Sequence, residues 1–244
     1  MTARTISLFG SRLRPCPYLS GRQERNVAAE LSGEDAGEIY DAAVRAGFRR
    51  SHDSIYRPAC PGCEACVPVR ICVRDFVARS SLARNMRRNA GLMARTIAPP
   101  KGDAEYFSLF ARYQNVRHPG GGMDRMSSRE FEGLMTSSPI DTFCAEFRDA
   151  DRNLVGVMLT DVISDGLSAV YSFFDPDRVN AGLGTYMVLW LVESARNRGL
   201  DYVYLGYWIA RSPKMAYKAR FRPLEALHPS DGWIPFEPSA PTES

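Results

Sequence analysis

The stretch AGLGTYMVLWLVESARNRG (residues 181–199) places two glycines in front of a run of good helix formers, with Gly199 as a C-terminal stop. Before it, DTFCAEFRDADRNLVGVMLTDVISDGLSAVYSFFDPD (residues 141–177) predicts three strands joined by the turns DADRN and SDG. After it, DYVYLGYW (residues 201–208) predicts a further strand. The predicted order is therefore an antiparallel meander, a glycine turn, a helix and a strand.

This order is similar to the acyltransferase fold of the GCN5-related N-acetyltransferases. In that fold a turn with Gln or Arg three positions before Gly-x-Gly opens a helix whose N–H groups bind the pyrophosphate of an acyl carrier. Gly182 and Gly184 have this spacing, but Val179 stands at the Gln/Arg position. We interpret this as a fold that is kept while the coenzyme A site is not. An ordinary strand-to-helix turn would also explain the glycines.

The chain has an ordinary globular composition, with 244 residues, 45% hydrophobic and 24% charged. No apolar run approaches the roughly 20 residues of a membrane span, and the N-terminal segment lacks a secretory core. We therefore expect a cytoplasmic protein. The break APPKGD (residues 98–103) predicts a boundary between an N-terminal cysteine-bearing α/β domain (1–98) and an acyltransferase-like domain (99–244). The predicted class is α+β, with a mixed, mostly antiparallel sheet in the second domain.

Cysteines are concentrated in SIYRPACPGCEACVPVRICVRDF (residues 54–76), whose second half alternates as a strand does. Two-residue spacers let Cys60, Cys63 and Cys66 face one centre, and Cys16 is the fourth candidate ligand for zinc or an iron–sulfur cluster. The alternative is a loop packed by reduced thiols. We expect the two remaining cysteines to be buried as small hydrophobes, namely Cys72 and Cys144.

Basic residues are unevenly distributed on a chain of net charge only +3. Residues 76–102 contain no Asp or Glu, and neither does RSPKMAYKARFRP (residues 211–223). Such acid-free blocks predict contact with a polyanion, although a solvated helix face is the alternative. The first block contains Arg79, Arg84, Arg87, Arg88, Arg95 and Lys101.

Seven ordered motifs resemble the arginyltransferase family of aminoacyl-tRNA–protein transferases, above all its bacterial aspartate/glutamate leucyltransferase branch. They run from about Pro15 to Leu227 and are PCPYLSGRQER, YRPACPGCEACVPVRI, RNMRRN, YSFFDPD, GLGTYMVLW, YVYLGYWI and KMAYKARFRPLE. Asn85 and Met86 depart from the Gln or Lys that the family often carries. The resemblance implies transfer of leucine from leucyl-tRNA to an N-terminal Asp or Glu of a protein, which marks that protein for degradation. Arginine as the donor amino acid stays open.

Aminolysis of an ester by an α-amine, whose pKa is about 7.7–8.0, needs positioning, a weak base and a stabilised oxyanion. Tyr171 and Ser172 are the candidate oxyanion donors. Asp175 is the candidate to accept the proton or to hold the amine, unless it only caps the DPD turn. Tyr207 is a further catalytic candidate. Trp208 is a candidate for the leucyl pocket, and core packing is the alternative for both. We expect no cofactor to be required for transfer.

The same resemblance suggests binding roles for further residues. Lys218 and Arg220 are candidates for the acceptor carboxylate, and Gly182 with Gly184 for substrate binding. The candidate tRNA contacts are Arg79, Arg84, Arg87, Arg88 and Lys214. We expect the three histidines to be structural or solvated, namely His52, His118 and His228. Two other classes remain, an acyl-CoA-dependent N-acyltransferase and a non-catalytic RNA-binding module with a zinc knuckle. The sequence does not predict the oligomeric state.

Overall fold

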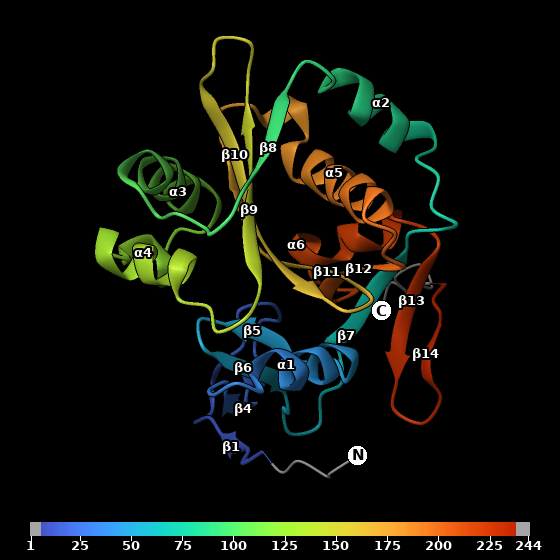
Figure 1. The fold of residues 1–244 in the computed structure, drawn as a ribbon. Coiled ribbons are helices and arrows are strands. Elements are labelled where there is room, and N and C mark those ends of the chain that lie inside the picture. The colour runs from blue at the N-terminus through green and yellow to red at the C-terminus, as the bar shows by residue number, and fades with distance from the viewer. Residues whose placement is uncertain (1–5, 238–244) are drawn as a thin grey trace.

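The computed structural model describes residues 6–237, so the two extreme ends of the predicted units 1–98 and 99–244 lie outside the described residues. One large sheet has the strand order β14-β13-β7-β12-β11-β10-β9-β8 (Figure 1). Its strands are β7 (Val67–Cys72), β8 (Met93–Ile97), β9 (Thr142–Arg148), β10 (Leu154–Ile163), β11 (Gly166–Phe174), β12 (Tyr202–Trp208), β13 (Leu224–His228) and β14 (Gly232–Pro235). Only β11 and β12 pair in parallel. The predicted α+β class with a mixed, mostly antiparallel sheet is confirmed.

Helices cover both faces of this sheet (Figure 1). On one face lie α3 (Ala104–Arg117) and α4 (Ser128–Thr136), and on the other α2 (Ser80–Arg88) and α5 (Leu183–Asn197). The first turns of α3 and α4 are capped by side chains, since Asp103 accepts from the Tyr106 N–H and Ser127 forms a capping box with Glu130. The remaining short helices are α6 (Pro213–Ala216), η1 (Met123–Arg125), η2 (Val179–Ala181) and η3 (Tyr217–Arg220). Across residues 6–237, none of the helices combines the length and apolar character that crossing a bilayer requires.

The N-terminal part adds a second sheet of order β1-β4-β6-β5 beneath the large one (Figure 1). It consists of β1 (Phe9–Gly10), β4 (Asn26–Glu30), β6 (Ser54–Pro58) and β5 (Arg49–Ser51), with α1 (Ala36–Arg45) packed on it and the pair β2 (Arg14–Pro15) and β3 (Gln23–Glu24) beside it. The large sheet takes strands from both sides of Ala98, because β7 and β8 precede that residue. The division into units 1–98 and 99–244 stays a prediction.

A buried ion pair joins the two sheets. Arg50 of β5 donates to both carboxylate oxygens of Asp161 of β10, at 2.8 Å and 2.6 Å, and the two side chains are 1% and 0% exposed. Tyr40 donates its hydroxyl to the same carboxylate at 2.6 Å, and Thr142 does so at 2.9 Å. Because Arg50, Tyr40 and Thr142 all donate to the Asp161 carboxylate, the ion pair fixes the position of the small sheet on the large one.

We expect Arg50→Met to lower the free energy of unfolding by about 3–5 kcal/mol, because it leaves the Asp161 carboxylate buried without its counter-ion. The measurement is equilibrium unfolding in urea. Arg74→Met is the matched control, since Arg74 and Asp201 are 3.5 Å apart with side chains 84% and 55% exposed, and exposed pairs contribute about 1 kcal/mol or less. A loss for Arg50→Met no larger than that of the control would contradict the role of the buried pair.

Candidate active site and nucleic-acid interface

The large sheet opens between its two parallel strands. β11 and β12 pair only from Gly166 opposite Tyr202 to Ser168 opposite Tyr204. The guanidinium of Arg49, which comes from β5, lies beyond the last pair and donates to the Val170 carbonyl at 3.2 Å and to the Ala169 carbonyl. A side chain thus satisfies backbone carbonyls that the separating strands leave without a ladder partner.

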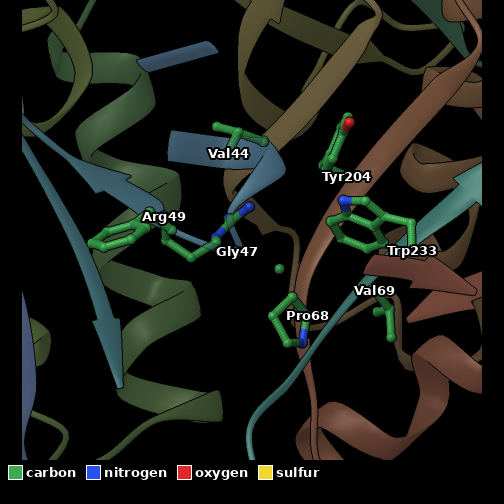
Figure 2. A pocket seen from close by; sticks show the side chains of 9 residues that line it. Val44, Gly47, Arg49, Pro68, Val69, Tyr204 and Trp233 are labelled. Atoms are coloured by element: carbon green, nitrogen blue, oxygen red, sulfur yellow. The ribbon is translucent and has the colours of Figure 1, made fainter. Parts of the chain in front are cut away.

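Gly206 of β12 makes room for this arginine. Its φ of +71° favours glycine, and a Cβ atom there would stand 2.7 Å from Arg49 Nε. Arg49 and Trp233 line a pocket of about 10 Å³ at this point, seen in Figure 2, which has room for roughly one water molecule. Among residues 6–237 no carboxylate pairs with Arg49, which is half-buried. Arg49 was not predicted from the sequence, because its partners carry no motif.

The candidates at the end of β12 are engaged in packing. The Tyr207 hydroxyl donates to the Gly47 carbonyl at 2.9 Å, and Trp208 Nε1 donates to the Ala216 carbonyl at 3.3 Å. Lys218 is buried and donates from Nζ to the Tyr207 carbonyl at 2.5 Å. Burial and the nearby positive charge of Arg49 lower the pKa of Lys218 to about 7. These contacts agree with the core alternative for Tyr207, and the catalytic and binding roles stay predictions.

The candidates of β11 lie where that strand ends. The Tyr171 hydroxyl accepts from Gln114 of α3, and burial raises the pKa of Tyr171. The Asp175 carboxylate accepts from Arg112 at 2.8 Å and from Arg178 at 3.3 Å, and also from the backbone N–H of its own turn. Two guanidinium groups therefore hold Asp175 as a turn residue. Its role as proton acceptor, and that of the neighbouring Ser172 as oxyanion donor, stay predictions.

The glycine turn is covered by α2. The side-chain amide of Asn85 donates to the carbonyls of Ala181 and Gly182, both at 3.1 Å, and Asn89 donates to the Ala181 carbonyl at 2.8 Å. Gly182 has a φ of +64°, and a Cβ atom there would stand only 2.5 Å from Asn85 Nδ2. At Gly184 a Cβ atom would stand 3.0 Å from the Phe174 ring. The positive φ favours glycine at position 182, whereas at position 184 the Phe174 ring would have to shift slightly to admit a Cβ atom.

This contact places four predicted arginines beside the turn. All four are exposed on α2 or at its N-cap, namely Arg79, Arg84, Arg87 and Arg88. Arg88 also donates to the Asn180 carbonyl in the turn, and Arg220 donates to Ser81 Oγ at 3.2 Å at the start of α2. The structure therefore places Arg220 in contact with α2, the helix that carries these arginines. We call the exposed side of α2 with these four arginines the arginine face.

Lys214, the remaining predicted tRNA contact, lies in α6 and contacts a histidine. Its Nζ is 3.3 Å from His118 Nδ1, and His118 Nε2 is 3.4 Å from the Tyr113 hydroxyl. Burial, and then the charge of Lys214, lower the pKa of His118. His118 was not predicted from the sequence as a site residue, because it contacts a lysine 96 positions away that no local pattern connects to it.

The four predicted metal ligands lie near one another. Burial, followed by the charges of Cys60, Cys16 and Cys63, raises the pKa of the Cys66 thiol to about 12. Yet in the described part of the chain no three His, Cys, Asp or Glu side chains are arranged to hold a metal ion. Zinc or an iron–sulfur cluster at these cysteines stays a prediction. Of the other two cysteines, Cys144 is buried as predicted, whereas Cys72 is half-buried.

Comparison with known proteins gives matches along most of the chain. The family description "Arginine-tRNA-protein transferase, C terminus" matches residues 105–228, and its N-terminal counterpart matches residues 14–87. An aspartate/glutamate leucyltransferase of Paramagnetospirillum magneticum is 55% identical over 92% of this chain and 91% of its own length. One of Rhodospirillum rubrum is 50% identical over 94% and 93%.

Among solved structures, L-PGS from Bacillus licheniformis superposes with a TM-score of 0.46 at 11% identity, over 74% of this chain and 51% of that one. The sequence matches define the chain as a transferase. It belongs to the arginine-tRNA-protein transferase family.

We expect Gly182→Ala to destabilise the protein more than Gly199→Ala does. Both glycines have a positive φ, which costs a side-chain-bearing residue about 1–2 kcal/mol, but only at Gly182 does the new methyl group meet Asn85. Equilibrium unfolding measures the two losses. Equal losses for the two variants would contradict the close contact.

We expect Lys218→Met to stabilise the folded protein at pH 7 and to remove a pH dependence. Since folding lowers the pKa of Lys218 to about 7, the unfolded chain binds more protons between that pH and about 10, and wild-type stability should rise with pH there. Urea unfolding at several pH values between about 7 and 9.5 measures the difference. Lys214→Met, which changes an exposed lysine, should keep the wild-type slope. If Lys218→Met keeps it too, the lysine does not titrate in this range.

Proposed function

We propose that this protein transfers leucine from leucyl-tRNA to the N-terminal Asp or Glu of acceptor proteins and so marks them for degradation. The observation that carries the proposal is the arginine face of α2, a helix whose buried side contacts the turn at Gly182 through the side chain of Asn85. The described relatives named aspartate/glutamate leucyltransferase support the choice of donor and acceptor. We place the reaction in the cytoplasm, where charged tRNA is available.

The proposed reaction is aminolysis of an ester. The acceptor's α-amine attacks the aminoacyl carbonyl carbon, a C–N bond forms, the C–O bond to the ribose breaks, and the tRNA hydroxyl leaves with a proton. The ester is already activated, so we propose that positioning and oxyanion stabilisation suffice and that no cofactor takes part. Tyr171 and Ser172, at the end of β11, remain our candidates for contact with the oxyanion.

The acceptor side chain is a carboxylate, which requires a cation at the site. Lys218 is buried beneath the Tyr207 carbonyl, and Arg220 binds Ser81 outside the opening between β11 and β12. Arg49 lies inside that opening, half-buried and without a carboxylate partner among residues 6–237. We therefore assign the acceptor's side-chain carboxylate to the guanidinium of Arg49.

A transfer assay tests the function. Purified protein should join leucine to a peptide that begins with Asp or Glu when leucyl-tRNA is supplied, and should leave a matched peptide beginning with Asn unmodified. Mass spectrometry of the peptide measures the product. Transfer from arginyl-tRNA in place of leucyl-tRNA would make arginine the donor, and transfer from acetyl-CoA alone would replace the proposal by an acyl-CoA-dependent activity.

The double variant Arg84→Ala with Arg87→Ala tests the arginine face in the same assay. Neither side chain takes part in a hydrogen bond or ion pair within residues 6–237, so the fold should be kept. Loss of two phosphate contacts should weaken tRNA binding. The slope of log affinity against log salt concentration should flatten by about 1.4–1.8. Binding titrations at several salt concentrations measure this. An unchanged slope would mean that the tRNA binds elsewhere.

A further inference from the structure

A cavity of about 390 Å³ lies at the end of the large sheet opposite the small one. Its walls come from β8, from β9 and from the hairpin that joins β9 to β10. This volume is typical of sites for small ligands or for part of a larger one. The cavity is lined by Met93, Ala94, Arg95, Glu146, Arg148 and Arg152, so its lining includes three arginines and one glutamate.

The carboxylate orients two of these arginines. Glu146 accepts from Arg148 Nε at 2.8 Å, from Arg95 Nε at 3.1 Å and from the Tyr106 hydroxyl at 3.0 Å, and its side chain is fully buried. Burial acts to raise its pKa, but the hydrogen bonds from Arg148 and Tyr106 and the charges of Arg148 and Arg95 hold the pKa of Glu146 at about 2. The ionised carboxylate therefore fixes two guanidinium groups at the cavity wall. Arg148 is also paired with Glu105, at 2.5 Å.

The third arginine occupies an unfavourable backbone conformation. Arg152 has a φ of +66° in the hairpin turn, a left-handed position that favours glycine and costs other residues about 1–2 kcal/mol. Its guanidinium makes no hydrogen bond or ion pair within the described residues, and the side chain is exposed. An unpaired cation at a strained position of a cavity wall indicates a ligand rather than a structural role.

The cavity lies close to the arginine face. β8 begins at Met93, five residues after Arg88, so the two are at most about 18 Å apart. Arg178, from the segment before α5, donates to Asp149 of the hairpin at 2.5 Å and holds the hairpin near the glycine turn. In Figure 1 the end of α2, the start of β8 and the β9–β10 hairpin follow one another along one edge of the molecule.

From this geometry we infer that the cavity is a phosphate-binding subsite for the backbone of the bound tRNA. The inference rests on the proposed function. Arg152 and Arg95 supply donors to phosphate oxygens, since guanidinium groups match phosphate geometry and double-stranded RNA is recognised largely through its backbone. The subsite extends the arginine face, so that the RNA contacts α2 and the hairpin together.

The decisive variant is Arg152→Gly. Glycine relieves the backbone conformation, so the thermal midpoint should stay the same or rise, and misfolding cannot account for a loss of binding. We expect tRNA affinity to fall severalfold, the slope of log affinity against log salt to flatten by about 0.7–0.9, and KM for leucyl-tRNA to rise more than kcat falls. Arg129→Ala is the control, because it removes the same charge from an exposed residue of α4.

The outcomes separate this inference from the proposed function. A wild-type protein that binds tRNA but transfers no leucine would overturn the proposed function, while the salt slope of Arg152→Gly would still decide the subsite. A wild-type protein that transfers leucine, with Arg152→Gly matching Arg129→Ala in affinity, salt slope and KM, would overturn the subsite. A flattened slope in Arg152→Gly alone would support it.

Discussion

The contact between α2 and the turn before α5 determines where this protein presents positive charge. Side-chain amides of Asn85 and Asn89 donate to backbone carbonyls of the turn, and each such bond contributes about 1 kcal/mol. The contact also carries a cost, because Asn85 Oδ1 is buried without a partner among the described residues, which is unfavourable by about 1–3 kcal/mol. Gly182 suits this approach, because its φ is positive and a Cβ atom there would stand 2.5 Å from Asn85 Nδ2. The arginine face is thus held in place by atoms that are themselves uncharged.

A second constraint comes from two neighbouring arginines of β5. Arg50 has a buried carboxylate, Asp161, and joins the small sheet to the large one. Arg49 has only carbonyl and hydroxyl partners, at the place where β11 and β12 separate. One arginine is therefore neutralised within the fold, whereas the other keeps an uncompensated charge in an opening of the sheet. Charge that the fold does not neutralise is available to a ligand.

Local features were predictable from the sequence, and long-range ones were not. The meander follows from strand and turn patterns within a few residues, and the structure confirms it. Alternation identified the strand at residues 67–72, but no pattern shows that it pairs with β12 and β13. β8, β13 and β14 were missed because they are short and partly exposed.

In the candidate site, too, local features were predictable from the sequence and long-range contacts were not. The arginines of α2 were found because an acid-free block is visible in the sequence itself. Arg49 was missed because its partners are backbone groups about 120 positions away, which any residue would supply. The sequence could not show that Arg112 holds the Asp175 carboxylate, because the two residues are 63 positions apart. The chemical groups that a chain carries can be deduced from its sequence, whereas the contacts between these groups depend on the fold.

The form of the basic surface explains why an acyltransferase-like order of elements is combined with an altered glycine turn. A pyrophosphate is a compact anion, and the N–H groups at one helix N-terminus are enough to bind it. Here Val179 leaves the turn without a polar first residue and is 74% exposed, while the carbonyls of the turn are bound to α2. Positive charge is instead spread along α2. Charges distributed over the length of a helix match an anion whose phosphates are distributed in the same way, as they are along the backbone of an RNA stem.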